Sequence, residues 1–257
     1  MKEQITIIKV GGKIVEESNS LDNLLDRFAA IPGNKVLIHG GGRSATSIAS
    51  RLGIESRMVN GRRITDEAML QVVTMVYGGL VNKNIVAGLQ ARGINALGLT
   101  GADCNIIKAH KRPAGDIDYG YVGDIDHADG TMLAKLIKEG IVPVIAPLTH
   151  DGKGSLLNTN ADTMAAETAK ALAKHYEVTL TYCFELPGVM RDPEDLSTLI
   201  PVITRDSYTT LLADGSISGG MIPKMDNAFN AIENGVAKVI ITHADAIDGS
   251  QGTHIIA

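Results

Sequence analysis

The sequence contains little cysteine, few aromatic residues and no excess of basic charge. Only two of its 257 residues are cysteine, and none is tryptophan. Cys104 and Cys183 lie far apart, without a CxxC motif or a nearby histidine cluster. This spacing excludes a disulfide scaffold and a structural zinc site. Such sparse cysteine usage favours a protein of the reducing cytoplasm.

Charge and hydropathy exclude two further classes of partner. The chain has 24 Lys and Arg against 29 Asp and Glu, so its net charge is −5. It therefore lacks the basic field that attracts nucleic-acid backbones. The longest nearly apolar stretch, residues 140–148, is far shorter than the ~20 residues of a membrane span. We predict a cytoplasmic protein with neither a nucleic-acid partner nor a membrane partner.

Glycine, in contrast, is abundant, with 28 residues, and many of these glycines follow apolar runs. The runs lack polar alternation, which is typical of strands covered on both faces, and helical patterns lie between them. The predicted fold is therefore α/β, a three-layer α-β-α sandwich with a mostly parallel central sheet. The predicted strands are residues 5–10, 35–39, 94–99, 142–147, 178–184 and 238–242. The predicted helices are residues 20–28, 43–53, 66–92, 129–139, 160–174, 206–213 and 224–234.

Three segments need separate interpretation. Residues 66–92 carry apolar side chains on more than one face, so they form either a central core helix or a surface on which two copies of the chain pack. Residues 111–123 contain a turn and a short exposed hairpin. The acidic stretch at residues 124–129 is interpreted as a solvated turn rather than a metal site. We place a domain division near residue 176, between a long helix and the next strand.

The turn His39-Gly-Gly-Gly-Arg-Ser-Ala45 follows a predicted strand and opens a helix. Consecutive backbone N–H groups at a helix N-terminus suit an anion, so we favour a phosphoryl-binding turn over a plain tight turn. The spacing also fits the dinucleotide fingerprint, but Glu55 comes too early to be its acidic partner. No GxxxxGK[ST] motif occurs, which excludes a P-loop NTPase. His39 itself is interpreted as a core residue.

Three further motifs are weak individually. Lys9-Val-Gly-Gly-Lys13 is a second glycine turn, between two lysines, and Asn158-Thr-Asn-Ala-Asp162 has a helix cap as its alternative interpretation. The segment 218–224 ends in a lysine in the first turn of a predicted helix, where the helix dipole disfavours a cation. A residue that opposes its local preference is a better functional candidate than one that follows it.

Taken in order, KVGGK, HGGG, VNGRRITDEAM, NTNADT and SGGMIPKM resemble the N-acetylglutamate kinases of the amino acid kinase family, over nearly the whole chain. The resemblance implies transfer of the γ-phosphoryl group of ATP to the side-chain carboxylate of N-acetyl-L-glutamate, in arginine biosynthesis. It implies Mg²⁺ carried by the ATP phosphates and no metal site on the protein. It also implies an acyl-glutamate-binding and dimerisation lobe at residues 1–176 and an ATP-binding lobe at residues 177–257.

The resemblance further implies a role for single residues. Lys9 and Lys224 would stabilise the transferred phosphoryl group, and Asp162 would hold both lysines. The implied substrate-binding residues are Gly41, Gly42, Arg63 and Asn158. The implied nucleotide-binding residues are Gly11, Gly12, Glu185, Leu186, Gly188, Ile217 and Ser218. The nucleotide side departs from the family pattern, because Phe184-Glu185 stands where a hydroxyl residue and an aspartate are usual.

Several alternatives remain open from the sequence. The short segment before Lys9 leaves no room for the leading helix that joins dimers of relatives into arginine-inhibited hexamers, so we expect an arginine-insensitive homodimer through residues 66–92. The activity could instead belong to another N-acyl-glutamate, such as N-succinylglutamate, or to another member of the family. A regulatory module without activity and a nicotinamide oxidoreductase are the more distant alternatives, which a substrate panel and an NAD(P)-binding assay would separate.

Overall fold

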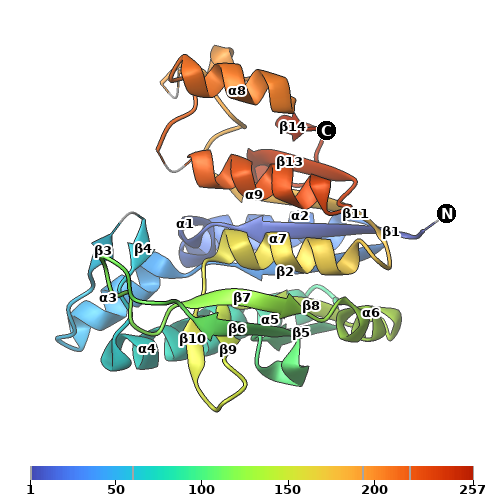
Figure 1. Cartoon of the computed structure of the whole chain (residues 1–257). Helices are drawn as coiled ribbons and strands as arrows, with labels where there is room; N and C mark the ends of the chain where they lie inside the picture. The colour runs from blue at the N-terminus through green and yellow to red at the C-terminus, as the bar shows by residue number, and fades with distance from the viewer. Residues whose placement is uncertain (1, 60, 193, 220, 257) are drawn as a thin grey trace.

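A central sheet of eight strands organises the chain (Figure 1). The structure is a computed structural model that describes residues 2–59, 61–192, 194–219 and 221–256. The strands of this sheet, in spatial order, are β12 (Val202–Ile203), β14 (Thr253–Ile255), β13 (Lys238–His243), β11 (Glu177–Phe184), β1 (Gln4–Val10), β2 (Asn34–His39), β8 (Val142–Ile145) and β5 (Ala96–Leu99). All neighbours from β13 to β5 pair in parallel, and only β14 runs antiparallel to β13. The prediction of a mostly parallel sheet is confirmed.

Both faces of the sheet are buried, which explains the missing polar alternation. Ile5 and Ile7 of β1 pack on one face, and Ile8 and Val10 pack on the other. The first face is covered by α6 (Gly130–Lys138), α7 (Ala161–Leu172) and α9 (Met221–Glu233), with α8 (Arg205–Ala213) beyond them. The second face is covered by α1 (Gly12–Glu16), α2 (Ser18–Ala30), α3 (Gly42–Arg51) and α5 (Asn82–Gln90). The predicted three layers are therefore present.

A second, smaller sheet lies in the lower half of the view in Figure 1, level with β8 and β5 of the central sheet. Its strands, in spatial order, are β10 (Leu156–Asn158), β9 (Leu148–His150), β6 (Ile107–Lys111) and β7 (Gly123–Ala128). β6 and β7 form an antiparallel hairpin, so the predicted hairpin exists, but its strands flank residues 112–122 rather than lying within them. The interpretation of the acidic stretch as a solvated turn is wrong, because most of it is strand β7. The stretch is nevertheless partly solvated, since Asp126 and His127 of β7 are exposed.

The predicted helix at residues 66–92 is continuous but not uniform. It consists of α4 (Glu67–Val73), the π-helical segment η1 (Thr74–Val81) and α5. In the described part of the chain, Glu67–Gln90 is the one helix long and apolar enough to cross a membrane by composition, with a mean hydropathy of 1.3, but 44% of that window is buried inside the protein. One side of the segment packs in the core, where Val72, Val76 and Ile85 are buried, while Met75 and Leu80 are exposed.

The remaining elements are short. A hairpin of β3 (Met58–Val59) and β4 (Arg62–Arg63) projects beside α3 and α4 (Figure 1). The 3₁₀ turns are η2 (Asp103–Asn105), η3 (Leu196–Thr198) and η4 (Ala244–Ala246). The division expected near residue 176 falls between α7 and β11, and β11 pairs with β1 along its length. One sheet therefore runs through both expected lobes.

Candidate active site

Two glycine turns interlock where β1 and β2 end. The chain leaves β1 through Gly11 into α1, and it leaves β2 through Gly40 and Gly41 into α3. Gly40 N donates a hydrogen bond to Val10 O at 3.1 Å. A Cβ atom on Gly40 would lie 3.1 Å from Gly12 N, so any side chain there would force the two turns apart. Carboxyl ends of adjacent parallel strands are where ligands of open α/β sheets bind.

Beside these turns, one carboxylate joins two lysines from distant parts of the chain. Lys9 Nζ on β1 lies 2.6 Å from Asp162 Oδ1, and Lys224 Nζ on α9 lies 2.7 Å from Asp162 Oδ2. The side chains are only 11%, 24% and 14% exposed for Lys9, Lys224 and Asp162 respectively. Burial alone would raise the pKa of Asp162, but the two lysine charges outweigh it and hold that pKa well below its ordinary value. The site therefore keeps a fixed net positive charge.

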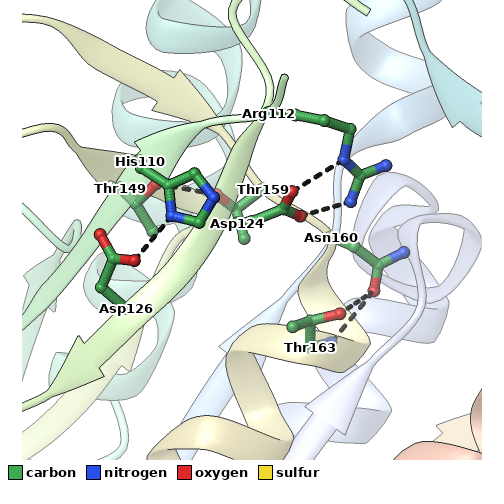
Figure 2. A network of polar contacts seen from close by, with 8 residues as sticks. All are labelled: His110, Arg112, Asp124, Asp126, Thr149, Thr159, Asn160 and Thr163. Carbon is green, nitrogen blue, oxygen red and sulfur yellow. Dashed lines mark hydrogen bonds and ion pairs between the residues drawn. The ribbon is translucent and has the colours of Figure 1, made fainter. Parts of the chain in front are cut away.

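Local capping places Asp162 in this position. Asn160 caps α7, with its Oδ1 accepting hydrogen bonds from the backbone N–H groups of Asp162 and Thr163, and Figure 2 shows its contact with Thr163. Asp162 is thus a first-turn residue whose carboxylate faces β1 and α9 rather than serving as the cap. The helix that carries Lys224 begins at Met221, which puts this lysine at the end of its first turn, as predicted.

A cavity of about 210 Å³ adjoins the glycine turns. Its wall includes Gly41, Gly42, Arg63 and Asn158, the four residues expected to bind the acyl-glutamate. Arg63 is buried and donates from Nη2 to Gly42 O at 2.8 Å and to Thr46 Oγ1 at 2.9 Å, while its Nη1 donates to Ser56 Oγ. Three donors are thus used to hold the guanidinium rigidly at the cavity wall.

Asn158 stands at the end of β10, on the wall contributed by the smaller sheet. Its Nδ2 donates to Thr65 Oγ1 at 2.9 Å, and its backbone N donates to Tyr121 O at 2.9 Å. The side chain is buried and immobilised by these contacts. Thr65, almost a hundred positions earlier in the chain, therefore helps to hold the cavity residue Asn158 in place.

Two cavity residues, Arg112 and Tyr77, were not predicted. Figure 2 shows Arg112 and Asp124 facing each other, and Arg112 Nε donates to Asp124 Oδ2 at 3.0 Å while Nη2 donates to Oδ1. This bidentate pairing is the main reason that the pKa of Asp124 is lowered, and the charge of Arg62 adds to the effect. Arg112 and Asp124 carry opposite charges and lie across the hairpin from each other, so a correct placement of the hairpin would have indicated this pair.

Tyr77 offered no such signal, because it lies within an apolar helical pattern. The side chain is buried, lines the cavity and comes from the π-helical segment η1. A Cβ atom on Gly41 would lie 2.9 Å from Tyr77 Cδ1, so the ring lies close against the glycine turn. Burial raises the pKa of Tyr77, and the neighbouring Arg63 charge only partly offsets that. Tyr77 is thus a neutral wall of the site.

The expected nucleotide-binding residues divide into two groups. Gly11, Gly12 and Glu185 line a second cavity of about 630 Å³ on the other side of the glycine turns. Glu185 is exposed there and lies 3.4 Å from Lys13 Nζ and 3.5 Å from Arg43 Nη2. The other expected residues, within the described part of the chain, are not in the walls of this cavity: Leu186, Gly188, Ile217 and Ser218.

Packing within the protein explains why Gly188 and Ile217 stand at their positions. A Cβ atom on Gly188 would lie 2.5 Å from Leu199 Cδ1, so this glycine allows close packing in the C-terminal half. Ile217 is buried in the hydrophobic core beside α8 and α9, whereas Ser218 is exposed. Their contact with a nucleotide stays a prediction.

The described residues hold no cluster of three or more His, Cys, Asp or Glu side chains that would suit a metal ion. Asp162 has each oxygen occupied by a lysine, and Glu16 Oε1 accepts a hydrogen bond from the backbone N of Ser44 at 2.7 Å. The acidic residues of β7 are also engaged, since Asp124 binds Arg112, and Asp126 Oδ1 lies 2.6 Å from His110 Nδ1 (Figure 2).

Comparison with known proteins agrees with this geometry. Residues 4–243 match the profile of the amino acid kinase family. The chain belongs to the amino acid kinase family. Acetylglutamate kinases of Bacteroides thetaiotaomicron and of Phocaeicola vulgatus are each 64% identical over 255 residues, which is 99% of both chains. A solved relative in the family fold is smu.665 from Streptococcus mutans UA159, with a TM-score of 0.81 and 26% identity over 98% of each chain.

Membership of the amino acid kinase family decides between the earlier alternatives. The dinucleotide interpretation of Gly40-x-Gly42-x-x-Ala45 is dropped, because the family match and the fold assign this turn to a kinase scaffold. The glycine triplet instead opens α3 beside two clustered lysines.

Proposed function

We propose that the chain is a kinase that transfers the γ-phosphoryl group of ATP to the side-chain carboxylate of N-acetyl-L-glutamate, in cytoplasmic arginine biosynthesis. Family membership and relatives named acetylglutamate kinase at 64% identity support this. The observation that carries the mechanism is the pair of lysines bridged by one buried carboxylate beside two glycine turns. No other described arrangement would serve a phosphoryl group as well.

The chemistry requires positive charge rather than a general base. A carboxylate nucleophile has a pKa near 4.3, so it is ionised at neutral pH. The barrier comes from bringing this anion to a polyanionic nucleotide, and preorganised positive groups lower it. A lysine about 4 Å from the transferring oxygens contributes on the order of 4 kcal/mol at an effective dielectric constant of 20, before the desolvation cost. We assign this role to Lys9 and Lys224, oriented by Asp162.

Substrate binding is assigned to the smaller cavity. Arg63 suits the α-carboxylate of the substrate, because its permanent positive charge is buried at the cavity wall and is held rigidly there. Asn158 supplies a second polar group from the opposite wall. The backbone N–H groups of Gly41 and Gly42, at the N-terminus of α3, would donate to the substrate and to the moving phosphoryl group.

ATP is assigned to the other side of the glycine turns. Its phosphates would contact Gly11 and Gly12, and its remainder would extend over the C-terminal lobe, residues 177–257, near Glu185. The further proposed contacts are Leu186, Gly188, Ile217 and Ser218. Since Asp162 and Asp124 are already paired with basic side chains, Mg²⁺ fits best on the ATP phosphates, where it would neutralise charge when bound.

Removal of single lysines tests the assignment. We expect Lys9→Ala and Lys224→Ala each to lower kcat about 100-fold or more, the usual scale for one lost transition-state contact. Lys138→Ala, which removes an exposed lysine at the end of α6, is the matched control. An ATP-dependent assay in which hydroxylamine traps the acyl phosphate measures kcat. An unchanged kcat in both test variants would refute the assignment.

We also propose a homodimer through the helix at residues 66–92, with the N-terminal lobe, residues 1–176, carrying the interface. Met75 and Leu80 of this helix are 55% and 50% exposed, although the rest of its apolar side chains are largely buried. A two-fold contact would cover both side chains. Leu80→Asp should yield monomers in light scattering, whereas Leu52→Asp, equally exposed at the end of α3, should not. A dimeric Leu80→Asp variant would refute this interface.

A second candidate substrate has an acid-bearing acyl group, such as N-succinyl-L-glutamate. Three arginines, Arg62, Arg63 and Arg112, line the cavity wall with a single carboxylate, Asp124. N-acetyl-L-glutamate carries two carboxylates: its α-carboxylate would face Arg63, and its side-chain carboxylate would face the lysines. One of the two excess charges of the cavity would then remain, and a third carboxylate on the acyl group would neutralise it. Comparison of kcat/KM for acetyl, propionyl and succinyl substrates decides, and Arg62→Ala should selectively weaken use of the succinyl compound if it is the better one.

A further inference from the structure

We propose that His39 is a positioning residue that sets the direction of the Gly41 N–H group in the phosphoryl-binding turn. This inference rests on the kinase activity proposed above and goes beyond it, because His39 touches neither proposed substrate. The side chain ends β2 and is completely buried. Its Nδ1 lies 2.7 Å from Gly40 O. A carbonyl oxygen only accepts hydrogen bonds, so Nδ1 carries the hydrogen.

The other ring nitrogen is equally constrained. Nε2 lies 3.1 Å from Asn82 Nδ2. That amide nitrogen also donates to Val144 O at 2.9 Å, and Asn82 Oδ1 accepts from Lys83 Nζ at 3.0 Å, so the orientation of the amide is determined. Nε2 must therefore be the acceptor of a neutral ring. Burial is the main reason that the pKa of His39 falls to about 4, and the Lys83 charge lowers it further.

Peptide geometry carries the effect from His39 to the site. In a trans peptide the carbonyl of one residue and the N–H of the next point in opposite directions. A Gly40 carbonyl turned toward the buried His39 ring therefore turns the Gly41 N–H away from it, out of the core. Because Gly40 N is bound to Val10 O at 3.1 Å, both ends of Gly40 are held. Without a side chain of its own, this glycine depends on such external bonds for its orientation.

The rate of phosphoryl transfer depends strongly on how the hydrogen-bond donors of the site are aligned. Displacement of a reacting or stabilising group by about 1 Å costs on the order of 100-fold in rate. A Gly40 carbonyl with no donor would be free to rotate and would leave a buried acceptor unpaired. We therefore expect loss of the Nδ1 hydrogen to reduce kcat more than KM, since the Gly41 N–H group acts on the moving phosphoryl group.

Two replacements of similar size separate this role from a merely structural one. In His39→Asn the amide nitrogen occupies the place of Nδ1 and still donates to Gly40 O. In His39→Gln the amide reaches the place of Nε2 and still meets Asn82, but Gly40 O loses its donor. We expect about a 30-fold or larger loss of kcat for His39→Gln and less than about a 5-fold loss for His39→Asn, at similar KM and similar melting temperature.

Tautomer observation provides an independent measurement on the wild-type protein. Long-range ¹H–¹⁵N spectra should contain one neutral Nδ1–H histidine between pH 5.5 and 8 whose signals disappear in His39→Asn. An Nε2–H or charged ring would overturn the proposal even if neither variant folds, and so would equal kcat in the two variants. An inactive wild-type enzyme would instead refute the proposed kinase activity, so the two failures are distinguishable.

Discussion

Neutralising Asp162 should impair both stability and catalysis, because one carboxylate compensates two buried ammonium groups. In Asp162→Asn the isosteric amide keeps the volume but loses the charge that faces Lys9 Nζ at 2.6 Å and Lys224 Nζ at 2.7 Å. At an effective dielectric constant of 20, each contact corresponds to about 6 kcal/mol of gross Coulomb attraction. Most of this offsets desolvation, and breaking a buried pair costs about 3–5 kcal/mol in measured cases.

We therefore expect Asp162→Asn to lower the free energy of unfolding by about 3 kcal/mol at pH 7, with kcat reduced about 100-fold or more. The sign of the pH dependence follows from the lowered pKa of Asp162. Stability from this group is complete above its unfolded-state pKa near 3.9 and is lost as the pH falls toward its native pKa. The variant should consequently differ less from wild type in strong acid than at pH 7.

Urea denaturation and steady-state kinetics on the same preparations measure both effects. Asp116→Asn is the matched control, because Asp116 is exposed in the loop between β6 and β7 and should change stability by less than about 0.5 kcal/mol. Wild-type stability together with wild-type kcat in Asp162→Asn would refute the reasoning. It would mean that the lysines need no carboxylate to hold them at the glycine turns.

Three further outcomes are expected. Arg63→Ala should raise KM for the acyl-glutamate about 10-fold or more and change kcat less, and the reverse pattern in substrate titrations would mean that Arg63 acts on the phosphoryl group. Gly41→Ala should lower kcat about 10-fold or more, since its Cβ would lie 2.9 Å from the Tyr77 ring, and restoration of activity by adding Tyr77→Ala would verify the clash. The pKa of His39 is about 4 in the folded protein and 6.5 in the unfolded chain, so acid favours the unfolded chain. The free energy of unfolding should therefore fall by about 3 kcal/mol between pH 6.5 and pH 4 because of this residue. Urea denaturation should show a weaker pH dependence in His39→Asn.

Much of the architecture followed from local pattern. Apolar runs without alternation predicted strands buried on both faces, and β1 confirms this with Ile7 on one face and Ile8 on the other. Short strands were missed, among them β3 and β4, because two-residue elements carry no periodicity. The π-helical segment η1 was also beyond prediction, since its apolar pattern is the same as that of an α-helix.

For the candidate site, the glycine turns and the lysines were visible because each breaks a local rule. Lys224 lies at a helix start where the dipole is unfavourable, and the glycine triplet leaves backbone N–H groups unshielded. Arg112 and Tyr77 break no such rule. Arg112 is a basic residue whose one signal, the opposite charge of Asp124 across the hairpin, depends on knowing where the strands lie. Tyr77 is an ordinary aromatic residue in an apolar helix, so nothing local distinguished it.

The sequence by itself determined the layered α/β class, the order of the strands along the chain and the chemical types available at each strand end, because these depend on periodicity and on short-range backbone chemistry. Only the tertiary structure decided that Lys9 and Lys224 share one carboxylate, that Arg112 faces Asp124, and that His39 holds the carbonyl of Gly40. Such contacts depend on strand order in space and on side-chain direction in a packed core. Neither is encoded within a window of neighbouring residues.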